Sequence, residues 1–305
     1  MKQRNFARHQ DCQGTTASLI LFAAIVLGIL LFPSQGRAGL ILDAEIRLTY
    51  EDNVVGILSD QTSGQTGGGG GGSNTATVMQ GGMGSGGRLY TGSTLTTSTS
   101  PGDFSGTVHA AIGGFSDVFS ESTVFVKGFA EHTSYDTYSD LDVTMGGVST
   151  GIATQLSKNS MARFSLTGKV KHFEDSQRNS TAYGGGVSLK ERPAQDLWFR
   201  QFVEYEKNEA DSPLFSYGGT KAGISAGYDL TRTTAAAAGF SYLVQEFDEP
   251  AGAELRTGTV FLTVEHALSR TWFFSAEYGL QTSRDGTSGT SITNNMYSLA
   301  LRYSY

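Results

Sequence analysis

Hydrophobic and polar side chains alternate along this chain with a period of two. The clearest run covers 40–50, where one set of positions is apolar and the intervening set carries charge. The apolar set is Leu40, Leu42, Ala44, Ile46, Leu48 and Tyr50. Because successive side chains of a strand point to opposite faces, this run predicts a strand with one apolar and one charged face.

The end of the chain repeats the arrangement. Tyr297, Leu299, Leu301, Tyr303 and Tyr305 alternate with Ser298, Ala300, Arg302 and Ser304. Further runs lie between the two ends, the clearest at 162–171 and 272–281, and weaker ones at 103–113, 122–134, 141–156, 181–191, 196–207, 216–230, 234–247 and 254–267. The sequence therefore predicts an all-β fold of about twelve strands, an even number.

The connections between the runs alternate in length. Short ones lie at 157–159, 192–195, 231–233 and 268–270, and long polar ones near 52–102, 174–180, 208–215, 248–253 and 283–294. A transmembrane up-and-down antiparallel barrel with short periplasmic turns and longer outer loops has this alternation, whereas a soluble sandwich does not. The connection at 113–121 is expected to be longer than a tight turn.

The first residues have the features of a secretory signal peptide. Basic residues precede an apolar run at 19–32, and small residues at Gly36 and Ala38 follow it, which predicts cleavage after Ala38. The barrel is then expected to occupy 39–305. Within it, the glycine-rich segment at about 56–102 is expected to be a disordered outer loop, because it has too little apolar surface to offset its ordering entropy.

Charge and cysteine content exclude several classes of protein. Removing residues 1–38 leaves 18 basic and 28 acidic residues and a net charge of −10, which disfavours nucleic acid as a partner. The single cysteine, Cys12, lies in the expected leader, so the mature chain is expected to lack disulfides and haem attachment. The histidines are scattered, and no cofactor or metal site is expected.

Alternation places many charged side chains on the expected lumen side. These are Asp43, Glu45, Arg47, Lys127, Glu131, Arg163, Lys169, Lys171, Arg200, Glu204, Glu206, Glu277 and Arg302. They could line a water-filled pore or form ion pairs that close it. Aromatic residues on the same face would narrow the lumen further: Phe125, Phe129, Trp198, Phe202 and Phe273. Of the two interpretations of the lumen, a narrow or plugged conduit is preferred.

Aromatic residues at the ends of the apolar faces are expected at the membrane interfaces. They are Tyr50, Trp272, Tyr278, Tyr297, Tyr303 and Tyr305. A terminal aromatic on such a strand resembles the signal by which bacterial outer-membrane barrels are recognised for assembly. The expected partners are therefore outer-membrane lipid and the barrel-assembly machinery, in the outer membrane of a Gram-negative bacterium.

The segment Tyr50-Glu-Asp-Asn-Val54, with the signal peptide and the terminal Tyr303-Ser-Tyr305, resembles a group of outer-membrane barrels that begin with a Tyr-Asp-Asp-Asn-Val-like segment. Members of that group occur among exopolysaccharide-export and porin–cytochrome conduit components. The resemblance implies a porin-like channel or sheath, with a multihaem cytochrome or an export component as a periplasmic or surface partner. Alternatively, Asp52 and Asn53 only turn the strand into its loop.

Two other functions are considered. Glu131-His132-Thr133-Ser134 resembles the His-x-Ser-Asn segment of outer-membrane phospholipase A and lipid A deacylase, which implies lipid hydrolysis through His132 and Ser134. Tyr135 stands where that family has asparagine, and short motifs of this kind often arise by chance. A structural or adhesive surface barrel is the third possibility. A non-enzymatic channel is preferred.

Overall fold

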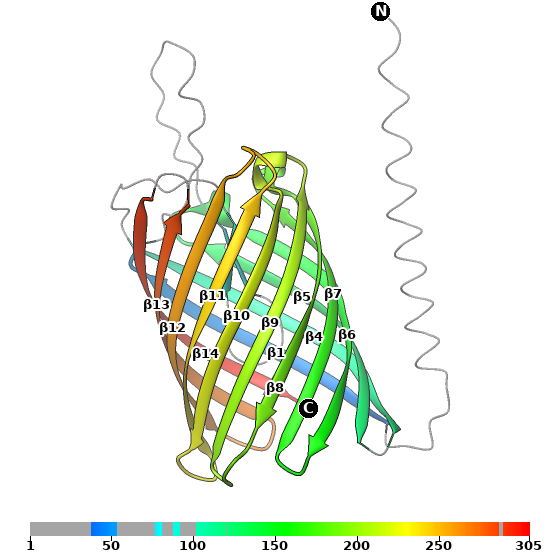
Figure 1. The fold of residues 1–305 in the computed structure, drawn as a ribbon. Coiled ribbons are helices and arrows are strands. Elements are labelled where there is room, and N and C mark those ends of the chain that lie inside the picture. Colours follow the sequence, from blue (N-terminus) through cyan, green and yellow to red (C-terminus); the bar gives the residue numbers. More distant parts are fainter. Residues whose placement is uncertain (1–37, 54–76, 81–87, 92–101, 120, 287–288) are drawn as a thin grey trace, which may run out of the picture.

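The computed structural model describes residues 38–53, 77–80, 88–91, 102–119, 121–286 and 289–305. These residues form a closed antiparallel barrel of twelve strands, in which β1 closes the ring against β14 (Figure 1). The barrel strands are β1 (Ala38–Glu51), β4 (Asp103–Phe119), β5 (Ser122–Tyr135), β6 (Val143–Ser157), β7 (Ser160–Phe173), β8 (Ser180–Glu191), β9 (Leu197–Ala210), β10 (Tyr217–Asp229), β11 (Thr234–Phe247), β12 (Glu254–Ala267), β13 (Trp272–Asp285) and β14 (Ser291–Ser304). The predicted fold is confirmed.

Closure depends on β1, which is paired along both of its edges. Its register against β14 runs from Asp43 opposite Ser304 to Glu51 opposite Met296, and its register against β4 runs along the whole strand. Every barrel strand therefore has two neighbours, and no edge of the barrel is left open to another chain.

The connections differ at the two ends of the barrel, as the sequence predicted. Tight turns lie at the end where β1 begins and the chain ends, and hydroxyl groups stabilise them: Ser269 Oγ accepts hydrogen bonds from the backbone of Thr271 and Trp272 (3.2 and 3.1 Å). Longer connections lie at the other end and contain η2 (Ser139–Leu141), η3 (Ser176–Arg178) and η4 (Pro213–Phe215) (Figure 1).

The connection between β4 and β5 is shorter than the sequence suggested. β4 continues to Phe119, and its register against β5 shifts between Asp117 and Phe119. The expectation of a long connection at 113–121 is wrong, because a β-bulge interrupts the alternation there while the strand goes on.

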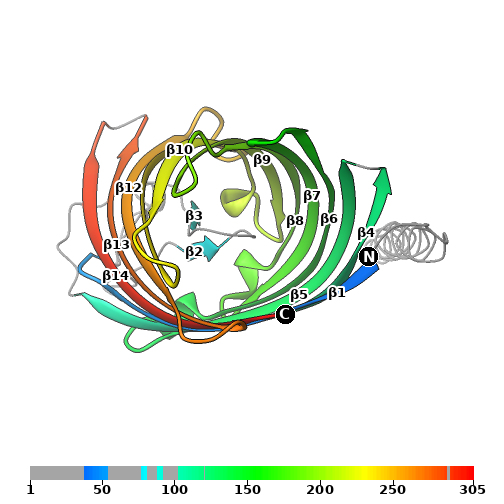
Figure 2. The same ribbon diagram turned by 90° about the horizontal axis from the view of Figure 1, so that it is seen from below.

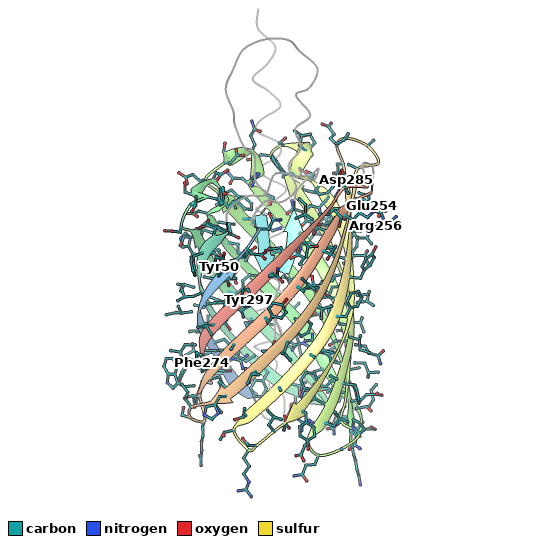
Figure 3. The ribbon with its side chains drawn as sticks, turned by 90° about the vertical axis from the view of Figure 1, so that its left-hand side faces the viewer. Tyr50, Glu254, Arg256, Phe274, Asp285 and Tyr297 are labelled. Atoms are coloured by element: carbon teal, nitrogen blue, oxygen red, sulfur yellow. The ribbon has the colours of Figure 1, made fainter. Side chains whose placement is uncertain are left out.

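Part of the glycine-rich segment forms a hairpin. β2 (Thr77–Gln80) pairs antiparallel with β3 (Arg88–Thr91). Seen along the barrel the two strands lie inside the ring, and seen from the side they lie toward the long-loop end (Figures 2 and 3). The rest of the expected disordered loop lies outside the described residues, as do residues 1–37 of the expected leader; Ala38 is the first residue of β1.

Burial alternates along each barrel strand. In β1, Ile46 and Leu48 are exposed on the outside, whereas Arg47 and Thr49 between them are buried on the inside. The outer surface is thus apolar and the interior polar, the reverse of a soluble domain and the arrangement expected for a barrel in lipid. Among the described residues, no helix is long and apolar enough to cross a membrane.

Candidate functional site

The inner surface of the barrel carries the charged residues that the sequence placed there. None of the thirteen is exposed: Arg47, Lys127, Glu131, Lys169 and Lys171 are buried, and the other eight are half-buried. Since the outward positions of the same strands are exposed, these side chains face the interior. Whether they line a conducting pore stays a prediction.

A network around Glu206 joins β7 to β9 near the long-loop end. Its carboxylate oxygens lie 2.7 Å from Lys169 Nζ and 3.1 Å from Lys171 Nζ, and one of them accepts a hydrogen bond from Tyr217 Oη (2.7 Å). Lys171, which is fully buried, also donates to Asn208 Oδ1 (2.6 Å). The strand between them, β8, places Gly184 opposite Glu206, and without a side chain there the ion pairs can reach across.

Other ion pairs also reach across an intervening strand. Lys127 on β5 lies 3.4 Å from Asp43 on β1, with β4 between them. Arg302 on β14 lies 2.7 Å from Glu265 on β12, with β13 between them. Such pairs connect strands that share no backbone hydrogen bonds with each other.

Six inward-facing aromatic rings each stand directly opposite a glycine on a paired strand. The pairs are Phe115 with Gly39, Phe125 with Gly151, Phe129 with Gly147, Trp198 with Gly227, Phe202 with Gly223 and Phe261 with Gly239. A methyl group on any of these glycines would lie within 2.2–2.8 Å of the opposite ring. The rings therefore occupy the space of the missing side chains, along the wall.

This packing bears on the expectation that inner aromatics narrow the lumen. Phe125, Phe129, Trp198 and Phe202 lie over glycines of the neighbouring strand instead of projecting across the interior. Phe273 has no such glycine opposite it, because it pairs with Ala267 and Arg302, and the Arg302 guanidinium lies 5.1 Å from its ring centre. Four of the five rings therefore narrow the lumen less than the sequence alone suggests.

Cations lie over several of these rings. The Arg163 guanidinium is 4.1 Å from the centre of Phe125, and the Lys190 ammonium is 4.8 Å from the nearer ring of Trp198. Over Phe202 two cations meet: the Arg200 guanidinium at 5.4 Å and the Lys221 ammonium at 5.7 Å. We call Arg163, Lys190, Arg200 and Lys221 the basic strip; it crosses the four neighbouring strands β7–β10.

Most of the interior charges lie on two sides of the barrel. We call the inward side of β7–β10 the basic wall; it carries Arg163, Lys169, Lys171, Lys190, Arg200 and Lys221 against Glu204, Glu206 and Asp229. We call the inward side of β12–β14, β1 and β4 the acidic wall; it carries Asp43, Glu45, Glu51, Asp103, Asp117, Glu265, Glu277 and Asp285 against Arg47 and Arg302. Viewed along the barrel, β7 and β8 lie opposite β12 and β13 (Figure 2).

Lys190, Lys221 and Glu265 are among the interior charges that the sequence did not reveal. They lie in the weaker runs at 181–191, 216–230 and 254–267. In β8 and β10 the inward positions are mostly small, including Gly184, Gly186, Gly219 and Gly223. Because glycine has no side chain, strands rich in glycine show only weak alternation of polar and apolar residues. The sequence therefore did not indicate that Lys190 and Lys221 face inward.

His132 and Ser134 lie on the outside of the barrel, and both are exposed. The Nδ1 atom of His132 shares a hydrogen bond with Thr144 Oγ1 (2.9 Å), on the neighbouring strand. The carboxylate of Asp142, which lies next to Val143 at the start of β6, accepts a hydrogen bond from the backbone of Tyr135 (2.7 Å). His132 and Ser134 therefore lie on the same face of β5, but they do not form a catalytic triad with a carboxylate.

Aromatic side chains form a row on the outer surface. Between ring centres, Tyr50 lies 4.9 Å from Phe104 and 6.4 Å from Tyr297, and Tyr297 lies 5.2 Å from Tyr278. Tyr50 and Tyr297 are labelled in Figure 3. The row crosses β4, β1, β14 and β13 toward the long-loop end. Toward the opposite end, Trp272 packs against Tyr303 at 5.3 Å. Tyr305, the expected assembly signal, is exposed.

The segment Tyr50–Asn53 closes the seam between β1 and β14. Asp52 accepts hydrogen bonds from the backbone and side chain of Asn295 (2.7 and 2.6 Å), and Glu51 accepts one from Asn294 (3.0 Å). The Asn53 backbone donates to Asn294 Oδ1 (3.1 Å). These contacts give the polar residues of the motif a structural role in holding the first strand to the last.

Among the residues the structure describes, no three His, Cys, Asp or Glu side chains are grouped so as to hold a metal ion. No family model matches the chain, and no curated protein matches its sequence.

Solved structures of bacterial outer-membrane barrels are similar in fold. The COG4313 outer membrane channel from Pseudomonas putida F1 matches with a TM-score of 0.60 and 8% identity, over 90% of this chain and 97% of that one. The KdgM porin in complex with disordered oligogalacturonate matches with a TM-score of 0.47 and 7% identity, over 86% and 99%. The channel DcaP of Acinetobacter baumannii matches with a TM-score of 0.45 and 8% identity, over 90% and 99%.

Proposed function

We propose that this protein is a channel of the bacterial outer membrane that lets small charged solutes pass through the barrel. The observation that carries the proposal is the reversal of polarity across a closed sheet, with an apolar outside and a charged inside. The outer surface is compatible with the bilayer core, because it is apolar and a closed barrel pairs its backbone hydrogen-bonding groups between neighbouring strands. Charged side chains in the interior require water or partners, and water-filled barrels conduct ions.

The fold of the COG4313 channel supports the proposal at the level of architecture. Export through the signal peptide and insertion by the barrel-assembly machinery belong to the same proposal. Fractionation of cells that produce the protein tests this part. We expect the processed chain in the outer-membrane fraction, resistant to extraction by salt; recovery as a soluble periplasmic protein would contradict it.

Conduction is tested by reconstituting the purified, processed protein into planar lipid bilayers. We expect stepwise increases in current as single barrels insert. Folding is checked on the same sample from the shift in gel mobility between unheated and heated protein. A folded sample that inserts into lipid without any current steps would contradict the proposal. The β2–β3 hairpin within the ring is expected to keep the conductance below that of an unobstructed barrel.

The proposal does not include enzymatic activity. Lipid hydrolysis through His132 and Ser134 lacks support, since His132 bonds to Thr144 and the nearby Asp142 is engaged by backbone. Docking of a multihaem cytochrome or an exopolysaccharide-export component stays a prediction from the Tyr50–Val54 resemblance. Identification of proteins that co-purify from outer membranes tests it, with loss of that partner after changes in the long loops as the expected result.

A further inference from the structure

Among the residues that the structure describes, His109 is the one histidine that faces the interior of the barrel. It lies on β4, within the acidic wall, and pairs in register with Glu45 on β1 and with Glu131 on β5. The other histidines of these parts of the chain are exposed on the outer surface: His132, His172 and His266. The lumen therefore borders a single imidazole, placed between two glutamates of the neighbouring strands.

The contact between His109 and Glu131 fixes which ring nitrogen can take up a proton. Nδ1 of His109 lies 3.2 Å from Oε2 of Glu131, and since a carboxylate ion only accepts hydrogen bonds, Nδ1 carries the hydrogen. Nε2 is then the atom that a proton from solution reaches. The His109 side chain is 23% exposed, so water contacts the ring, whereas that of Glu131 is only 6% exposed. The ring of Phe129 stacks beside the imidazole, with 6.2 Å between ring centres.

The other interior charges around His109, which come from β1, β5, β12 and β14, are joined to partners of opposite sign. The pairs are Glu45 with Arg47 (2.7 Å), Asp43 with Lys127 (3.4 Å) and Glu265 with Arg302 (2.7 Å). On the far side of Glu131, β6 places the uncharged Met145 opposite it. Glu131 is therefore the carboxylate whose charge a protonated His109 offsets.

We infer that His109 is a selectivity residue of the channel, whose protonation adds a positive charge to the acidic wall and makes the channel more permeable to anions in acidic solution. This inference rests on the proposed channel function. Histidine is the side chain whose ordinary range of titration lies between about pH 5 and 8. With a neutral imidazole, the pair of His109 and Glu131 carries one negative charge; with an imidazolium, the two charges offset each other. Charges that border a lumen bias which ions pass.

The test measures the reversal potential of reconstituted barrels in one KCl gradient at about pH 8 and at about pH 5.5, on either side of the ordinary range of histidine. For the unaltered protein we expect the ratio of chloride to potassium permeability to rise about twofold at the lower pH. His109→Gln keeps a hydrogen-bond donor for Glu131 but cannot take up a proton. Most of the rise is therefore expected to disappear in this variant.

Two further variants separate the charge of His109 from a structural role. His109→Lys keeps a positive charge at both pH values, so we expect the higher permeability ratio at both, a result that loss of packing alone does not produce. His266→Gln is the matched control, because His266 lies on the outer surface and shares a hydrogen bond with Thr234 (2.9 Å). Its shift with pH is expected to equal that of the unaltered protein. The gel mobility of unheated samples checks that each variant folds.

The outcomes distinguish the inference from the proposed function. Absence of current from folded protein overturns the channel, and the inference with it. Current whose selectivity is the same at both pH values overturns the inference while the channel stands. The same holds for a shift of undiminished size in His109→Gln, or for one that His266→Gln also removes.

Discussion

The basic wall and the acidic wall are built from the same kind of strand, yet they hold their charges differently. On the basic wall, cations lie over aromatic rings that glycines accommodate, as Arg163 does over Phe125. On the acidic wall, carboxylates bond to cations, hydroxyls and amides, as Asp43 does with Lys127 and with Ser304 (2.8 Å). A neutral ring does not offset the charge of a cation that lies over it, whereas a cation does offset the charge of a carboxylate that it binds.

The difference between the walls therefore predicts that the basic wall controls selectivity and that the acidic wall chiefly supports the barrel. Substitutions that reverse or remove charge on one wall at a time distinguish the roles of the two walls most sharply. Changes to the ring packing test whether the inner rings border the path through the barrel.

Reversing two charges of the basic strip is expected to have the largest effect. Arg163→Glu/Arg200→Glu replaces two cations by carboxylates, so both walls become acidic and the channel is expected to prefer cations, with a change in permeability ratio of about tenfold. Reversal potentials in a KCl gradient measure this ratio. Arg256→Glu, on the outer surface, is the control, and an unchanged ratio in the double variant would contradict the assignment of selectivity to this wall.

Removing the carboxylate at the centre of the network around Glu206 is expected to destabilise the barrel. Glu206→Gln leaves Lys169 and the fully buried Lys171 without their ion-pair partner. Loss of one member of a buried ion pair costs about 3–5 kcal/mol of unfolding free energy. Urea unfolding in lipid, followed by tryptophan fluorescence, measures it. Glu209→Gln, at an exposed position on the same strand, is the control; equal stability of the two variants would refute the structural role of the network.

Filling the space beside a ring is expected to reduce conductance. In Gly227→Val the new side chain occupies the place of the Trp198 indole, since even a methyl group there would lie 2.2 Å from it. The indole must turn into the lumen, and we expect single-channel conductance to fall roughly twofold as the pore narrows. Gly168→Val is the control, because a methyl group there meets nothing within 4 Å. Unchanged conductance in Gly227→Val would show that the ring does not border the path.

Neutralising the acidic wall is expected to have the smallest effect. Glu265→Gln/Glu277→Gln removes repulsion of anions and frees Arg302 from its ion pair with Glu265. We expect the chloride preference to increase by less than about twofold, because the remaining carboxylates of this wall still act on the lumen. A larger effect than that of Arg163→Glu/Arg200→Glu would reverse the roles of the two walls.

Much of the fold followed from alternation alone. The strand runs, the alternating connection lengths and the inward positions of Asp43, Glu45 and Arg47 all depend on a period of two, which is local in sequence. The end of β4 did not, because its bulge between Asp117 and Phe119 breaks that period without ending the strand.

The arrangement of the interior could not be predicted from sequence. The ring–glycine pairs depend on register: Trp198 lies opposite Gly227 only because β9 and β10 pair as they do. Ion pairs such as Lys171 with Glu206 span a third strand, so they depend on the small residues of β8 as well. Lys190 and Lys221 were missed because glycine-rich strands do not mark their two faces.

Recording from single reconstituted barrels in a KCl gradient is the most direct test of the account. The account predicts discrete current steps whose reversal potential lies toward the equilibrium potential of chloride. Folded barrels that insert without passing current, or steps that reverse toward the equilibrium potential of potassium, would contradict it.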